Sequence, residues 1–344
     1  MNTFDELIAL TNGAGPRNLL LGNGYSIAAS ENFNYSNLFQ KTIFSSMEWI
    51  VNIFNKYQTC NFEFILEVLK HAENVNEEIV RVVLGESKAH LSNQVDIIHS
   101  ARINLVSSFI NTLRTIHPEN NHLDQHGDGI TGDMFIKNRE FLRNFSKFFT
   151  LNYDLLLYWS LLNSEIVFAD NFSSGLDYKF NDNFSQNTTL WFLHGALHLR
   201  TDRFTGQTRK VVYRSQSTLL RQLADDLINS MYPTIVFEGT ASEKRSKIGS
   251  NTYLSMANQH LASLGGSLFT FGFSFNDNDA HMQKAIADSD ISMLCVGIRG
   301  SEQNNLHICG KCREIQTLAD SKRAATLSPP LQVYFYNTSE MSIW

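Results

Sequence analysis

The stretch Phe148-Phe149-Thr150-Leu151-Asn152-Tyr153-Asp154, followed by Leu155-Leu156-Leu157-Tyr158, decides how the chain is organised. Its apolar start predicts a buried strand, and the leucine-rich continuation predicts a helix that begins at once. Thr150, Asn152 and Asp154 would then lie at the carboxyl end of the strand, where open α/β sheets bind ligands. One Asn or Asp could simply cap the helix. Because three polar side chains occur within five positions, we interpret the junction as part of a site.

The composition is that of a globular protein with one large domain or two modest ones: 344 residues, 43% of them hydrophobic and 18% charged. A formal net charge of -6 and a pI near 6.0 argue against direct nucleic-acid binding. We expect no signal peptide and no membrane association, because no long apolar run occurs. Four cysteines make a poor disulfide framework in a chain of this length, which favours a reducing, cytoplasmic location.

Two groups of residues resemble metal ligands. Cys309-Gly310-Lys311-Cys312 is half of a zinc site, with His307 as a third candidate, but no fourth ligand is evident and a turn with two free thiols is the better interpretation. His117, His122 and His126 fall in a segment rich in Asn, Asp and Gly, which is typical of an exposed loop. We therefore expect no bound metal.

Short apolar runs that alternate with helical patterns predict an α/β fold with a doubly wound, Rossmann-like parallel sheet. The predicted strands are 17–21, the run beginning at Phe148, 166–168, 190–193, 209–214, 234–237, 267–271, 291–297 and 331–336. Several of them end in small polar residues or glycine: Gly22/Ser26, Asn152/Asp154, His194/Gly195, Gly239/Thr240 and Gly272/Ser274. A parallel sheet would bring these ends to one edge.

From about Ser36 to Arg143 the pattern changes to helices, with apolar residues at i, i+3, i+4 and i+7. We therefore predict a helical insertion over 36–143, which would act as a lid or assembly surface, and a core built from 1–35 and 144–344. The apolar stripes of the insertion could be internal core or subunit contacts, so a homo-oligomer stays open.

Three shorter segments carry expectations of their own. Residues 3–9 predict a short helix. The charged run 243–247 predicts a solvated turn, and the polar run 276–279 can cap the helix that follows it.

The first strand leads into Gly22-Asn23-Gly24-Tyr25-Ser26, a layout typical of a phosphate-binding turn. The third glycine of the dinucleotide fingerprint is missing, since Ile27 stands there, and an ordinary tight turn would explain the other two. His194 closes an apolar run and is followed by Gly195. A histidine at a strand end can be structural, but the glycine allows a ligand to come close and favours a function.

The order of Gly22-x-Gly24-x-Ser26, Thr150-x-Asn152-Tyr153-Asp154, His194-Gly195 and Gly272-x-Ser274 resembles the sirtuin superfamily, and most of all its bacterial branch in anti-phage defence. The resemblance spans roughly residues 17–298 through short motifs. It implies that Asn152 positions the nucleophile beside the nicotinamide ribose of NAD, that Asp154 hydrogen-bonds the carboxamide, and that His194 acts as a base toward the ribose hydroxyls. The other NAD contacts that it implies are Gly22, Asn23, Gly24, Ser26, Thr150, Gly272, Ser274 and Asp279.

Departures from the family pattern narrow the expectation. Asn23 replaces the usual alanine, Asn34-Tyr35-Ser36 lacks the arginine of the sirtuin Asp-Phe-Arg, and the four-cysteine zinc ribbon of the deacylases is absent. The resemblance then implies an NAD hydrolase that releases nicotinamide and linear or cyclic ADP-ribose. It would be an effector of abortive anti-phage defence, activated by a protein partner or a sensor, which could respond to nucleotides. An NAD- or ADP-ribose-binding sensor or scaffold without turnover, and a deacylase or ADP-ribosyltransferase, are the alternatives.

Overall fold

Six apolar segments form the central sheet: β1 (Arg17–Leu21), β2 (Lys147–Thr150), β3 (Leu190–Phe192), β6 (Gly265–Phe271), β7 (Asp290–Ile298) and β8 (Gln332–Asn337). Their order is β3-β2-β1-β6-β7-β8, and all neighbouring pairs are parallel. This is the strand order of a Rossmann fold, in which the direction of winding reverses beside the first strand, here between β1 and β6. The predicted doubly wound α/β fold is confirmed.

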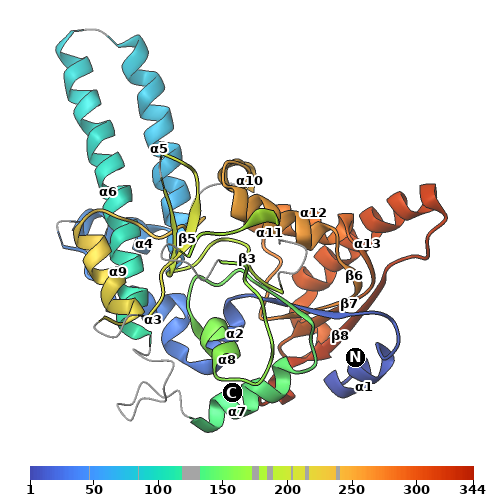
Figure 1. Ribbon diagram of the computed structural model, residues 1–344. Helices are drawn as coiled ribbons and strands as arrows, with labels where there is room; N and C mark the ends of the chain where they lie inside the picture. Colours follow the sequence, from blue (N-terminus) through green and yellow to red (C-terminus); the bar gives the residue numbers. More distant parts are fainter. Residues whose placement is uncertain are drawn as a thin grey trace.

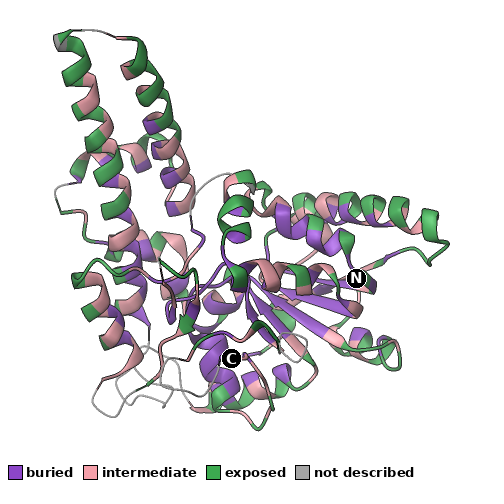
Figure 2. Ribbon diagram, turned by 45° about the horizontal axis from the view of Figure 1, so that its top comes forward, coloured by how far each residue is buried: buried purple, intermediate pink, exposed green. Residues whose placement is uncertain are grey.

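The computed structural model describes residues 1–45, 47–83, 85–117, 132–172, 178–183, 189–202, 204–213, 217–237 and 241–344. Figure 1 shows helices on both faces of the sheet. One layer contains α11 (Thr252–Ala262), α12 (Ala280–Asp288) and α13 (Leu306–Thr326), and the other contains α1 (Phe4–Leu10), α7 (Gly132–Leu142) and α8 (Leu156–Leu162). The strands between them are largely buried, as Figure 2 shows, apart from the edge strand β8, which is mostly half-buried. This burial explains the continuous apolar runs in the sequence.

Between α2 (Asn23–Ala29) and β2 the described chain is helical, with α3 (Tyr35–Lys41), α4 (Glu48–Lys56), α5 (Phe62–Val82), α6 (Glu86–Ile116) and α7. Helices α5 and α6 pack as a long hairpin that projects from the sheet (Figure 1). The root of the hairpin is buried, whereas its outer half is largely exposed (Figure 2). Helix α7 differs from the other four because it packs on the sheet, where Phe141 meets Phe271 with ring centroids 5.8 Å apart.

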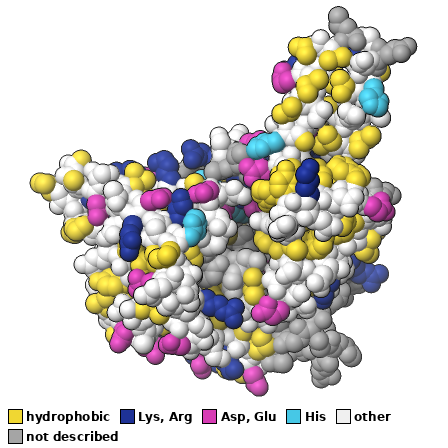
Figure 3. Space-filling view, turned by 180° about the vertical axis from the view of Figure 1, so that it is seen from behind, with side chains coloured by type: hydrophobic (Ala, Val, Ile, Leu, Met, Phe, Trp, Pro, Cys, Tyr) yellow, Lys and Arg dark blue, Asp and Glu magenta, His cyan; other side chains and the backbone are white. Residues whose placement is uncertain are grey.

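The outer half of this hairpin carries exposed apolar side chains, and Figure 3 shows hydrophobic side chains gathered on the projecting part. Val75, Ile79 and Val82 are exposed at i, i+4 and i+7 on α5, so they share one face of the helix. Glu73, which is buried in the middle of the hairpin, joins its two helices through Arg102 at 2.9 Å and His99 at 2.7 Å. No helix in the described residues combines the length and apolar character needed to cross a membrane.

Two of the predicted strands are wrong, and a third, predicted over 209–214, forms a strand only at its start. Residues 166–168 form no strand, and 234–237 contribute only an isolated bridge between Gly195 and Ile235. The run 209–214 contains β5 (Thr208–Lys210), which pairs antiparallel with β4 (Leu199–Thr201) in a separate two-stranded sheet. Apolar runs of three or four residues say little about whether a neighbouring strand exists to pair with them. Gly239 and Thr240 lie outside the described residues.

Of the three shorter segments, one prediction is confirmed and two differ from the structure. The helix predicted over 3–9 is confirmed as α1, which Thr3 and Glu6 begin with a capping box. The charged run 243–247 is not a solvated turn but part of α10 (Ala241–Gly249), in which Lys244 is buried. The polar run 276–279 precedes α12, yet no side chain of it caps the helix.

The interpretation of the cysteine and histidine segments also needs correction. Cys309 and Cys312 do not lie in a turn; they are buried free thiols in α13. His117 is not solvated but buried at the end of α6, where its Nε2 accepts a hydrogen bond from the Leu155 N–H at 2.9 Å. His122 and His126 lie outside the described residues. The remaining described helix of the core, α9 (Leu219–Ile228), packs against α6.

Candidate functional site

A cleft of about 380 Å³ opens at the carboxyl ends of β1, β2, β3 and β6, beside the point where the strand order reverses. Open α/β sheets bind their ligands at this position. The predicted site residues in its lining are Gly22, Asn23, Gly24, Asn152, Asp154, His194, Gly272, Ser274 and Asp279. The helical segment between α2 and β2 supplies part of the wall through Leu38, Asn61, Glu63, Phe109 and Leu113. The strand ends that the sequence singled out therefore converge.

The Gly-x-Gly turn after β1 is shaped by packing against the loop after β6. A Cβ on Gly24 would lie 2.6 Å from the Gly272 Cα, and one on Gly22 would lie 2.5 Å from the Gly272 oxygen. The N–H groups of Gly22 and Gly24 donate to Phe271 and Gly272 at 3.0 Å. This corrects the expected phosphate cradle, because these two amides are already engaged. The glycines bring two loops together, and the cleft wall is formed by their backbones.

Ser26 and Thr150, which were expected to contact NAD, lie behind the cleft instead. Ser26 is fully buried, and its Oγ donates to Asp154 at 2.5 Å and accepts from Asn152 Nδ2 at 2.8 Å. Thr150 is also buried, and its Oγ1 accepts from the Asn152 backbone N–H at 3.0 Å. Both residues therefore hold Asn152 in place rather than line the cavity.

Asp154 serves the helix as well as the cleft. Its Oδ1 accepts from the Leu156 N–H at 2.9 Å at the start of α8, so the capping interpretation is also right. Burial raises the pKa of Asp154, although its hydrogen bonds from Ser26 and Leu156 oppose the shift. Asp154 is also one of the residues that line the cleft.

His194 follows β3 and reaches the cleft from its own turn. The turn needs Gly195, whose φ is +79° and which packs directly against the Thr234 carbonyl. His194 Nε2 lies 3.0 Å from His281 Nε2 and 3.8 Å from an Asp279 oxygen. Burial lowers the pKa of His194 well below 6.5, and the nearby Lys244 ammonium lowers it further. The imidazole is therefore a neutral base at physiological pH.

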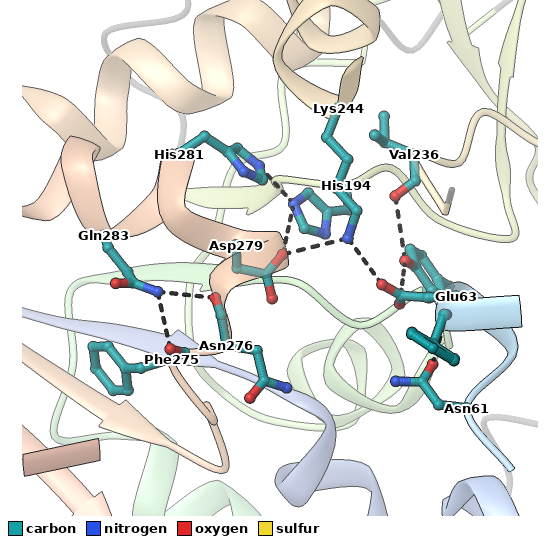
Figure 4. A network of polar contacts seen from close by, with 12 residues as sticks. Asn61, Glu63, His194, Val236, Lys244, Phe275, Asn276, Asp279, His281 and Gln283 are labelled. Atoms are coloured by element: carbon teal, nitrogen blue, oxygen red, sulfur yellow. Dashed lines mark hydrogen bonds and ion pairs between the residues drawn. The ribbon is translucent and has the colours of Figure 1, made fainter. Parts of the chain in front are cut away.

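Two charged residues at the site were missed by the sequence reasoning. Lys244 of α10 is 1% exposed and contacts Glu63 at 2.8 Å and Asp279 at 3.5 Å. Glu63, in the first turn of α5, also accepts from the hydroxyls of Tyr35 and Tyr153, both at 3.1 Å. The sequence offered no signal for either, because Glu63 sits within an amphipathic pattern and Lys244 within a charged run. Figure 4 shows the two residues meeting beside His194 and Asp279.

Comparison with known families gives one match. A family model described as "Domain of unknown function (DUF4917)" matches residues 19–344. The chain belongs to the DUF4917 family. No curated protein matches the sequence. The matched range of this DUF4917 chain contains every strand of the central sheet except the first two residues of β1, and every residue that lines the cleft.

His194, Asp279 and His281 of the DUF4917 cleft form a group that could hold a metal ion, since their ligand atoms lie within 4.8 Å of one another. The 3.0 Å separation of the two Nε2 atoms is a hydrogen-bond distance, so one proton shared between the rings accounts for it. Lys244 already supplies a positive charge to Asp279. A shared proton and the Lys244 ammonium thus account for these contacts without a metal ion, and the expectation that no metal is bound stays a prediction.

Proposed function

We propose that this protein is an NAD hydrolase that cleaves the nicotinamide–ribose bond and releases nicotinamide and ADP-ribose. The observation that carries the proposal is the meeting of Asn152, Asp154 and His194 in one cleft at the reversal point of a Rossmann sheet. These three residue types occur in the order that resembles the NAD-hydrolysing branch of the sirtuin superfamily.

The chemistry needs little beyond orientation and charge. Bond cleavage passes through an oxocarbenium-like state and expels neutral nicotinamide, so the site must hold the dinucleotide, stabilise positive charge and place a water. Asp154 would hold the carboxamide, and Asn152 would orient the water beside the ribose. His194, neutral because its pKa lies well below 6.5, would accept a proton from a ribose hydroxyl or the water.

Depletion of NAD harms the cell that makes the enzyme, so the proposal includes control of the activity. We place the protein in the cytoplasm, as an effector of abortive anti-phage defence that a partner or sensor protein activates. The helical segment supports this part of the proposal, because it supplies one wall of the cleft and extends from it as the exposed α5–α6 hairpin. It would act as a lid or an assembly surface.

The test is to incubate the purified protein with NAD and to measure nicotinamide release, with and without the products of neighbouring genes. We expect turnover in at least one condition, and we expect Asn152→Ala and His194→Ala to lower it by about 10²-fold or more. Asn304→Ala and His307→Ala are the matched controls, because both residues are exposed and neither lines the cleft.

Three results would argue for another function. Absence of turnover in every condition would contradict the hydrolase. NAD binding without nicotinamide release would favour a sensor or scaffold, and release only in the presence of an acylated peptide or another acceptor would favour a deacylase or ADP-ribosyltransferase.

A further inference from the structure

We infer that Glu63, at the root of the helical hairpin, is a positioning residue of the catalytic site that acts through Lys244 on Asp279 and His194. The inference rests on the proposed function for its catalytic consequence. It makes the α5–α6 hairpin part of the site and not merely a cover, because the hairpin supplies one member of the network that holds the base.

The root of α5 places Glu63 firmly. The Asn61 side chain caps the helix by accepting from the Phe64 N–H at 3.2 Å, and Phe62 is completely buried beside it. Glu63 then points into the cleft, where the hydroxyls of Tyr35 and Tyr153 donate to its Oε1. Because Oε1 is held by two donors, the other oxygen has a defined direction, and it meets Lys244 at 2.8 Å.

Lys244 joins the helical segment to the Rossmann core. Its ammonium group is almost fully buried, and a buried cation requires anionic partners. It has two, Glu63 of α5 and Asp279 at the amino end of α12. Burial alone would lower the pKa of Lys244, but the two carboxylates outweigh this effect and its pKa is raised. The lysine therefore stays charged between them.

The network ends at the proposed base. Asp279 lies 3.8 Å from His194 Nε2, and His281 Nε2 lies 3.0 Å from the same atom (Figure 4). When His194 gains a proton, Asp279 stabilises the imidazolium and Lys244 opposes it. Glu63 determines how strongly Lys244 opposes protonation of His194, because its carboxylate neutralises the charge of the lysine. Among the residues that the structure describes, the titratable and charged groups around His194 and its neighbours are Lys244, Asp279, His281 and Glu63, with Arg245 near His281 and the phenols of Tyr35 and Tyr153 on Glu63.

Removing the charge of Glu63 and removing the charge of Lys244 should therefore shift the pKa of His194 in opposite directions. Glu63→Gln leaves the positive charge of Lys244 less balanced, which disfavours protonated His194 and makes it a weaker base. We expect kcat to fall about tenfold and KM to change little. The acid limb of the pH profile should move to lower pH. Lys244→Met leaves two carboxylates without their cation, which favours protonated His194. We expect its acid limb to move about one pH unit higher.

The experiment is a double-mutant cycle of Glu63→Gln and Lys244→Met, with kcat, KM and the pH profile measured for nicotinamide release. The double variant removes both charges, so its acid limb should lie closer to that of the wild type than either single variant does. Glu63→Asp, which keeps the charge, should restore part of kcat. Glu67→Gln, one turn further along α5 and outside the cleft lining, is the matched control and should behave like the wild type.

The proposed function and this inference can fail separately. If the wild type releases no nicotinamide, the NAD-hydrolase proposal fails, and NMR titration of the His194 ring in the same variants still tests the network. Opposite shifts of its pKa in Glu63→Gln and Lys244→Met support the positioning role. The inference is overturned if both variants shift the pKa of His194 in the same direction, or if Glu63→Gln cannot be distinguished from Glu67→Gln.

Discussion

The hydroxyl of Ser26 fixes the orientation of the Asn152 amide. Ser26 Oγ has one proton, which it donates to Asp154 Oδ2 at 2.5 Å, so it can only accept the hydrogen bond from Asn152 Nδ2 at 2.8 Å. The Nδ2 group therefore faces Ser26, and Asn152 Oδ1 is the amide atom that can accept a hydrogen bond from a ligand or water in the cleft. A residue buried behind the site thus sets the polarity of its surface.

Ser26→Ala tests this relationship. The substitution removes a donor from a buried carboxylate and an acceptor from a buried amide, so we expect the free energy of unfolding to fall by about 1–3 kcal/mol. The pKa of Asp154, already raised by burial, should rise further because Ser26 no longer lowers it. Nicotinamide release should fall more than stability explains. Urea unfolding and kcat/KM are the measurements, with the exposed Ser292→Ala as control. Unchanged kcat/KM would contradict the positioning role.

Gly272→Ala tests whether the glycines at the cleft serve close packing. Gly272 has a φ of +67°, and a Cβ there would lie 2.5 Å from the Gly24 Cα and 2.6 Å from the Tyr25 nitrogen. We expect strain and overpacking to lower the free energy of unfolding by about 2–4 kcal/mol and to reduce NAD binding. Gly310→Ala is the opposite case, because a Cβ at this position in α13 would have no atom within 4 Å other than the neighbouring backbone of its own helix. It should stabilise the protein by about 0.5–1 kcal/mol. Equal unfolding midpoints for the two variants would contradict this account.

Much of the fold and half of the site could be predicted because the relevant signals are local. Apolar runs identified all six core strands, and four of them (β1, β2, β3 and β6) are followed by glycine or small polar residues, which parallel strands bring to one edge. Asn152, Asp154, His194 and Ser274 were found in this way. The false strands at 166–168 and 234–237 have the same local pattern, and only their surroundings prevent pairing.

The rest of the site depends on contacts between distant parts of the chain. Glu63 and Lys244 are 181 positions apart, and their ion pair exists because the helical hairpin meets α10. Neither residue stands out within its own helix. The glycine turn after β1 is similar, since its pattern suggested a phosphate cradle and its actual partner is the loop at Gly272. These contacts depend on tertiary packing, and the spacing of residues in the sequence does not predict them.

His198→Phe should make the protein less sensitive to acid. His198 is buried between aromatic rings, and its ring centroid lies 4.8 Å from that of Tyr158 and 4.9 Å from that of Phe192. Neither nitrogen of the His198 ring has a hydrogen-bond partner. Burial lowers its pKa well below 6.5, and Lys210 and Arg200 add to the effect. The folded state therefore binds fewer protons than the unfolded state below pH 6.5, and stability falls as the pH falls through this range.

Removing this group should reduce the loss of unfolding free energy between pH 7 and pH 5 by about 2 kcal/mol. Urea unfolding at the two pH values measures it, and nicotinamide release should persist because His198 does not line the cleft. His307→Phe, at an exposed position, should leave the pH dependence as in the wild type. The same acid sensitivity in His198→Phe and wild type would show that His198 is not the group responsible.

The charges of the cleft predict a preference for NAD over NADP. Its described lining includes the acidic residues Glu63, Asp154 and Asp279 and contains no lysine or arginine. Lys244 lies outside this lining and is already paired with Glu63 and Asp279, so the additional 2′-phosphate of NADP would meet carboxylates and no free cation. We expect kcat/KM for NADP to be lower by about 30-fold or more, because like charges at short range disfavour the complex.

A cation introduced at the cleft should narrow this preference. Asn276 is exposed and lines the cleft on the side of Ser274, so Asn276→Arg should raise kcat/KM for NADP relative to NAD by about tenfold. Asn304→Arg adds the same charge at an exposed position outside the lining and should leave the ratio unchanged. The measurement is nicotinamide release from each dinucleotide by the three proteins. Equal kcat/KM values for NAD and NADP in the wild type would contradict the electrostatic argument, because the extra phosphate would then encounter no repulsion.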